Sequence, residues 1–114
     1  MILEFHTKVL GKKAARRLRK LKGEFLTFRS KLPEEMAFDV YLDNRNLGRA
    51  NIEDLYKEKL NFGSLGLHHA LAGGFDTIKE QQRALKRAGY RFKPLGQYEA
   101  YPVFFIGFFG EHNE

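Results

Sequence analysis

Cysteine is absent from this chain of 114 residues. Disulfide scaffolds, thiolate zinc sites and cysteine nucleophiles are therefore excluded. Long apolar runs are also missing: the longest, Val103–Phe109, is far shorter than the roughly 20 residues that a membrane span needs. The N-terminus shows no secretory signal pattern. We therefore expect a protein of the cytoplasm that does not enter a membrane.

The length and composition favour one folded domain over residues 1–114. Hydrophobic residues make up 43% of the chain and aromatic residues 14%, more than disordered segments carry. A chain of this size removes roughly two-thirds of its unfolded surface from water when it folds, so a core can form without cross-links.

Positive charge is concentrated in the first third of the sequence. The chain has 20 Lys and Arg against 14 Asp and Glu, a net charge of +6. Residues 1–33 carry a net charge of +8, residues 34–57 carry −3 and residues 58–114 carry +1. Such asymmetry indicates either a site for a polyanion or two surfaces that compensate each other.

Hydrophobic periodicity predicts the secondary structure, with a period of two for strands and about 3.6 for helices. We predict strands over residues 2–9, 24–32, 36–43, 90–93 and 103–109, and helices over 12–22, 52–60 and 77–88. The order resembles the ferredoxin-like βαββαβ arrangement, with residues 45–74 as an insertion. The expected fold class is α+β, an antiparallel or mixed sheet with helices packed on one face.

The predicted helix over residues 12–22 is the strongest functional signal. Its basic residues repel one another at spacings of three and four, and a polyanion would relieve that repulsion. The candidate phosphate contacts are Lys12, Lys13, Arg16, Arg17, Arg19 and Lys20. Two alternatives stay open: charge pairing within the chain, with Asp39, Asp43, Glu53 and Asp54 as the expected partners, or an acidic protein partner.

A second basic face lies on the predicted helix over residues 77–88. It adds the candidate nucleic-acid contacts Arg83, Lys86, Arg87, Arg91 and Lys93. If the two helices lie side by side, their basic faces form one patch. Tyr90 and Phe92 alternate with Arg91 and Lys93, and either stack on bases or point into the core.

Enzymatic signals are weak. His68 and His69 are adjacent, so a regular helix would point them about 100° apart, and the chain has no zinc-ligand spacing. No Asp or Glu stands two positions before a Lys, so the carboxylate-x-Lys nuclease signature is missing. We assign no catalytic residue, metal ligand or cofactor. A toxin-type ribonuclease using His68 or His69 with Glu53 is a weaker alternative.

The apolar C-terminal strand predicts burial on both faces. Its candidate interface residues are Phe104, Phe105, Phe108 and Phe109. Either a homodimer or the segment 45–74 would cover its second face.

The sequence therefore favours a small basic nucleic-acid-binding protein, for DNA or RNA, over an enzyme. The alternative is a regulatory or inhibitory protein that docks on a larger protein partner.

Overall fold

The computed structural model describes residues 2–90 and 99–109, without the side chains of Leu55, Glu99 and Phe109. The elements in chain order are β1 (Ile2–Phe5), α1 (Thr7–Leu10), α2 (Lys12–Arg19), β2 (Glu24–Arg29), β3 (Ala37–Leu42), β4 (Arg45–Leu55), β5 (Leu60–Asn61), the 3-10 turn η1 (Phe62–Ser64), α3 (Leu67–Ala72), α4 (Ile78–Arg87) and β6 (Glu99–Phe109). The predicted α+β class is confirmed.

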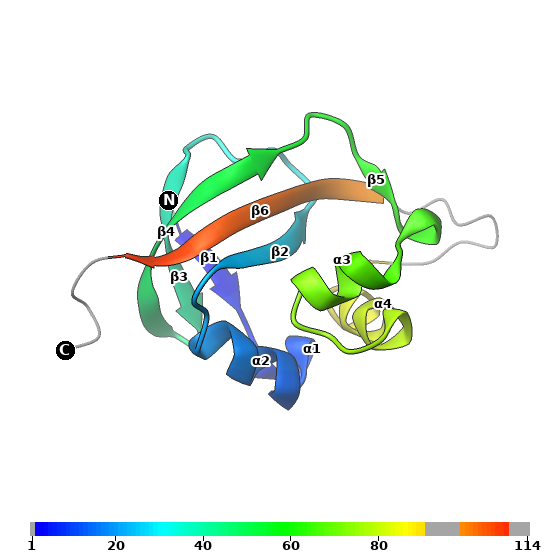
Figure 1. Ribbon diagram of the computed structural model, residues 1–114, viewed down its shortest axis with the longest axis horizontal. Helices are drawn as coiled ribbons and strands as arrows, with labels where there is room; N and C mark the ends of the chain where they lie inside the picture. Colours follow the sequence, from blue (N-terminus) through cyan, green and yellow to red (C-terminus); the bar gives the residue numbers. More distant parts are fainter. Residues whose placement is uncertain (1, 91–98, 110–114) are drawn as a thin grey trace.

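The strands form one mixed sheet that curls into a half-barrel above the helices (Figure 1). Its order is β1-β3-β4-β6-β2, with β5 paired to β6 beside this path. β1 and β3 are parallel, and the other pairs are antiparallel. Because β4 lies in the middle of the sheet, residues 45–55 are not an insertion. The ferredoxin-like arrangement is therefore not confirmed.

The hairpin of β3 and β4 contains one confirmed prediction and one error. Phe38, Val40 and Leu42 of β3 are buried, as their alternation predicts. The predicted helix over residues 52–60 is wrong, because β4 occupies most of it. In β4, the buried residues Ala50 and Ile52 alternate with the exposed residues Arg49, Asn51 and Glu53. Asp43 and Asn44 join the strands with φ of 51° and 69°, the left-handed values that a tight two-residue hairpin turn needs.

Two core clusters lie on opposite faces of β2. Phe25 belongs to the first cluster, inside the half-barrel, together with Leu18 of α2 and Phe105 of β6. Leu26, the next residue, belongs to the second cluster with Phe62. Successive residues of a strand point to opposite faces, so β2 is covered on both. The second cluster also contains Leu85 of α4, so the expectation of helices on one face of the sheet is not confirmed at this strand.

The sequence did not predict the start of α1, but it did predict the start of α4. The predicted strand over residues 2–9 stops at Phe5, because the Asp43 carboxylate accepts hydrogen bonds from the backbone N–H and the hydroxyl of Thr7 and starts α1 there. The capping box of α4 is confirmed: Thr77 Oγ1 accepts from the Glu80 N–H at 3.1 Å, and Glu80 Oε1 accepts from the Thr77 N–H at 3.2 Å. The predicted strand over residues 90–93 lies almost wholly outside the described residues.

Candidate nucleic-acid interface

Helix α2 presents a basic face because its apolar residues all point inward. Ala14, Ala15 and Leu18 are buried against the core. Lys, Arg and Ala are good helix formers, so the segment is helical despite its crowded charge. Its other residues, Lys12, Lys13, Arg16, Arg17 and Arg19, are exposed, as is Lys20 at the end of the helix.

Two of these cations are held by the segment that begins α4. Lys13 Nζ lies 2.6 Å from Asp76 Oδ2 and 3.5 Å from Glu80 Oε2. Arg17 Nη1 lies 2.8 Å from Asp76 Oδ1 and donates to the carbonyl oxygen of Gly74 at 3.0 Å. The hydrogen bond from Lys13, and then that from Arg17, lowers the pKa of the Asp76 carboxyl. Pairing within the chain therefore accounts for Lys13 and Arg17.

The ion pairs differ from those that the sequence suggested, although Arg19 does act on Asp43: hydrogen bonds from Thr7, and then the nearby His6 and Arg19, lower the pKa of this carboxyl. Asp39 lies 3.9 Å from Arg49 instead, and Asp43 binds Thr7. Glu53 and Asp54 lie near Glu24, whose pKa is raised by burial and then by these two carboxylates. In the described part of the chain, no group of three or more His, Asp and Glu side chains gathers as a metal site would require.

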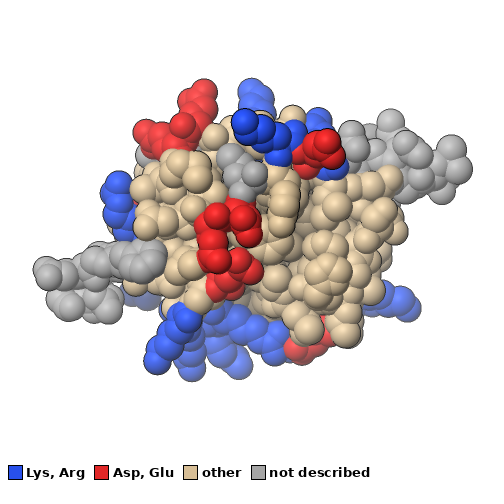
Figure 2. Space-filling view, turned by 45° about the horizontal axis from the view of Figure 1, so that its top comes forward, with Lys and Arg blue, Asp and Glu red and all other residues tan. Residues whose placement is uncertain are grey.

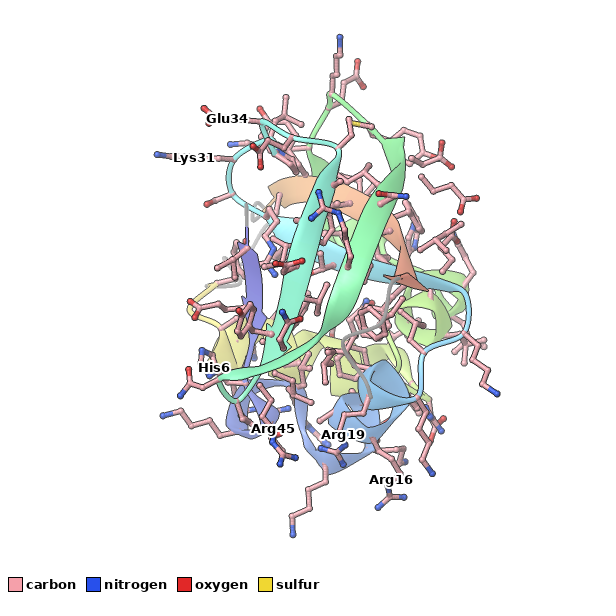
Figure 3. All side chains as sticks on the ribbon, turned by 90° about the vertical axis from the view of Figure 1, so that its left-hand side faces the viewer. His6, Arg16, Arg19, Lys31, Glu34 and Arg45 are labelled. Carbon is pink, nitrogen blue, oxygen red and sulfur yellow. The ribbon has the colours of Figure 1, made fainter. Side chains whose placement is uncertain are left out.

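Four cations of α2 and its C-terminal end have no ion pair with any residue that the structure describes: Lys12, Arg16, Arg19 and Lys20. Arg16 and Arg19 lie at the same end of the molecule as Arg45, the first residue of β4 (Figure 3). Figure 2 shows Lys and Arg gathered along the lower edge of the molecule. Arg45 was not among the predicted contacts, because only the turn between β3 and β4 places it at this end of the molecule.

The basic residues of α2 and α4 meet in one cleft. This cleft has a volume of about 210 Å³ and is lined by Lys12, Lys13, Arg83 and Arg87, with Glu80 as the acidic member. Arg87 is fixed by a 2.7 Å hydrogen bond from its Nε to the carbonyl oxygen of Val9. Lys86 is exposed on the same helix, whereas Arg91 and Lys93 lie outside the described residues.

The described side-chain contacts of the histidine pair lie within α3 and the residue that precedes it. His69 Nδ1 accepts a hydrogen bond from the Gly66 N–H at 2.9 Å, and its ring lies 3.9 Å from that of His68. Burial, and then the neighbouring His68, lower the pKa of His69, which favours the neutral, accepting form. No described interaction joins Glu53 to either histidine.

The Phe-rich strand is covered largely by its own chain. Phe105 is fully buried in the first cluster. Phe104 packs against the second cluster, and Phe108 packs against the first. Phe62 and Leu65, from the segment 45–74, belong to the cluster beneath Phe104, as the alternative to a dimer required. The side chain of Phe109 lies outside the described residues.

Comparison with known proteins gives no match: no protein-family model, no curated protein and no solved structure resembles this chain significantly. Over the residues that the structure describes, every helix is too short or too polar to cross a membrane.

Proposed function

We propose that this protein binds nucleic acid, DNA or RNA, through α2 and the cleft between α2 and α4. The observation that carries the proposal is the convergence of Lys12 and Lys13 with Arg83 and Arg87 in one cleft. The cleft adjoins the exposed cations of α2, so positive charge continues from one element to the other. A phosphate backbone needs positive charge and reach at several points, and this arrangement supplies both.

The number of basic residues of α2 without an ion pair in the described part of the chain favours a polyanion over a single acidic group as the ligand. Asp76 and Glu80 neutralise part of the charge on Lys13 and Arg17. Lys12, Arg16, Arg19 and Lys20 stay exposed and repel one another at spacings of three and four. Several phosphates in a row match several cations in a row, whereas one carboxylate would engage only one of them.

The test is binding of fluorescently labelled single- and double-stranded DNA and RNA over a salt series. The variant Lys12→Gln/Arg16→Gln/Lys20→Gln leaves the structural pairs of Lys13 and Arg17 intact. Each lost phosphate contact should flatten the slope of log K against log salt by about 0.7–0.9. We therefore expect weaker binding and a slope reduced by about two.

The matched control is Arg49→Gln/Lys57→Gln/Lys59→Gln, which also removes three exposed cations. Lys57 and Lys59 lie in the connection from β4 to β5, at the top of Figure 1, whereas α2 lies at the bottom. Nucleic-acid binding that is equal in the two triple variants, or absent from the wild type at low salt, would overturn the proposal.

One observation favours a second candidate, docking on a protein partner. Leu67 and Leu71 of α3 are 51% and 56% exposed and are four residues apart, on one face of the helix. The variant Leu67→Ser/Leu71→Ser should abolish capture of that partner, or self-association measured by light scattering. It should leave nucleic-acid binding unchanged, so the two candidates are separable.

A further inference from the structure

A cavity lies at the seam of the half-barrel, which is the gap between the two strands at the ends of the sheet order. These ends are β1 and β2. The cavity has a volume of about 220 Å³, and residues of β1, β2, α1 and α4 line it. Most of its wall is apolar, with Phe5, Phe28 and Tyr90 among its aromatic members. It adjoins the basic cleft, with which it shares Leu10 and Phe75, but the four Lys and Arg residues of that cleft are not among the residues known to line it.

Arg29, the last residue of β2, brings a positive charge into this apolar wall. Its guanidinium carbon lies 5.1 Å from the centre of the Phe5 ring. Its Nε is buried and has no hydrogen-bond partner among the residues that the structure describes. No carboxylate of the described residues pairs with it, and burial lowers the pKa of its guanidinium. A desolvated cation of this kind is stabilised by an anion that enters the cavity.

Gln81 of α4 brings a second polar group to the same cavity. Its side chain is only 2% exposed. Its Nε2 donates to the carbonyl oxygen of His69 at 3.0 Å, which fixes the orientation of the amide. Its Oε1 is therefore left as an acceptor, and that atom is buried with no partner within residues 2–90 and 99–109. Buried polar atoms without partners are rare and costly, so a ligand that donates here would gain affinity.

We propose that the seam cavity binds a small aromatic carboxylate bearing a hydroxyl group, with the carboxylate on Arg29 and the hydroxyl donating to Gln81 Oε1. A cavity of roughly 150 Å³ holds benzene, so about 220 Å³ leaves room for a ring with two small substituents. The aromatic and aliphatic wall matches the ring.

A monoanion fits this site better than a phosphate ester does. Arg29 is the one Lys or Arg among the residues known to line the cavity, and Glu4 and His6 are also in its lining. A dianionic phosphate would bring more negative charge than one guanidinium balances, next to a carboxylate. The proposal is independent of nucleic-acid binding, because it uses none of the cations of α2.

The experiment is isothermal titration calorimetry of the full chain with four kinds of probe. These are 3- and 4-hydroxybenzoate, benzoate, 4-fluorobenzoate as a ligand of similar size without a donor, and 4-hydroxybenzamide as a neutral ligand of similar shape. We expect the better hydroxybenzoate to bind at least about tenfold more tightly than benzoate, 4-fluorobenzoate and the amide.

Two variants assign the site. Arg29→Gln should weaken hydroxybenzoate binding by about ten- to a hundredfold and leave 4-hydroxybenzamide binding unchanged. Its matched control, Arg49→Gln, removes an exposed arginine and should change neither. Ala88→Phe adds a ring at a position of the cavity lining other than Arg29 and Gln81, and should weaken the binding of every probe.

Three results would overturn the proposal. The first is no heat of binding for any carboxylate at millimolar concentration. The second is equal affinity for the carboxylates and for 4-hydroxybenzamide. The third is undiminished binding in a folded Ala88→Phe variant. If Arg29→Gln does not fold, the ligand ranking on the wild type and the Ala88→Phe variant decide.

Discussion

The ring of Phe5 on β1 meets the ring of Phe25 on β2 edge to face, with their centroids 6.1 Å apart. These two strands stand at opposite ends of the sheet order, so this contact spans the seam of the half-barrel. The Phe105 ring lies 5.6 Å from that of Phe25 and 6.3 Å from that of Phe5. Packing of aromatic rings, rather than a ladder of backbone hydrogen bonds, joins the ends of the curled sheet.

Removing one of these rings should be strongly destabilising. Phe25→Ala deletes a fully buried ring from the seam, and we expect the free energy of unfolding to fall by about 3–5 kcal/mol. Urea denaturation followed by circular dichroism measures this. Ile2→Ala, at a position 54% exposed on β1, is the control and should change the value by about 0.5 kcal/mol or less. Equal losses in both variants would show that the rings do not hold the seam.

The junction between α1 and α2 depends on a glycine. Gly11 has φ 92° and ψ 156°, a conformation that is almost restricted to glycine. Gly11→Ala should therefore lower the free energy of unfolding by about 1–3 kcal/mol. Gly23→Ala is the matched control, because Gly23 has no positive φ and an added Cβ would meet no atom within 4 Å. Thermal denaturation of both variants checks the prediction, and a Gly11→Ala variant as stable as Gly23→Ala would contradict it.

Nucleic-acid affinity should rise when Asp76 loses its charge. Asp76→Asn removes the carboxylate that pairs with both Lys13 and Arg17, so Arg17 becomes more available to phosphates and Lys13 keeps only its 3.5 Å contact with Glu80. We expect tighter binding and a steeper salt slope, measured by fluorescence anisotropy.

The control for this change is Asp54→Asn, which alters the net charge equally at an exposed site on β4, close to Glu24 rather than to α2. If Asp54→Asn tightens binding as much as Asp76→Asn does, net charge rather than the basic cleft sets the affinity.

Stability should fall between neutral and mildly acidic pH because of His69. Its folded-state pKa is lowered from the ordinary value of 6.5, so the unfolded state binds more protons as the pH drops. The contribution of neutral His69 to the free energy of unfolding is fully present at pH values above that ordinary pKa. It is lost as the pH falls through the folded-state pKa. Protonation also removes the acceptor for the Gly66 N–H. Urea denaturation at pH 8, 6.5 and 5 measures the loss.

The variant His69→Gln isolates this effect, because a glutamine oxygen can accept from Gly66 without titrating. We expect a flatter pH dependence over this range than in the wild type. His6→Gln, which replaces an exposed histidine outside α3, is the control. A wild-type slope in His69→Gln would mean that another group titrates.

The sequence predicted correctly those elements that depend on residues close together along the chain. The capping box of Thr77 and Glu80 and the alternation of β3 both lie within a few positions of sequence, and both are confirmed. β4 was missed because Asn51 and Asp54 have the spacing of a helix start. The burial of Ala50 and Ile52, which makes this segment a strand, depends on pairing with β3 and β6.

In the candidate sites too, the sequence shows what is local to one segment and does not show what the fold brings together. The density of Lys and Arg in α2 is visible in the sequence, but its carboxylate partner Asp76 lies 63 residues after Lys13. Arg29 was in no prediction, since an isolated arginine at the end of a strand is ordinary. Only the curling of the sheet places the Phe5 ring against its guanidinium.

A sheet that stops short of closing into a barrel leaves two edge strands, and edge strands are templates for pairing with another chain. Here α1 and α4 line the seam between those edges, with Val9, Leu10 and Leu85 in its wall. α1 and α4 therefore protect the edges of β1 and β2 from pairing with a strand of another molecule. Loosening of α4 would expose two strand edges together with the phenylalanines between them, so the first consequence of partial unfolding would be aggregation into β-rich assemblies.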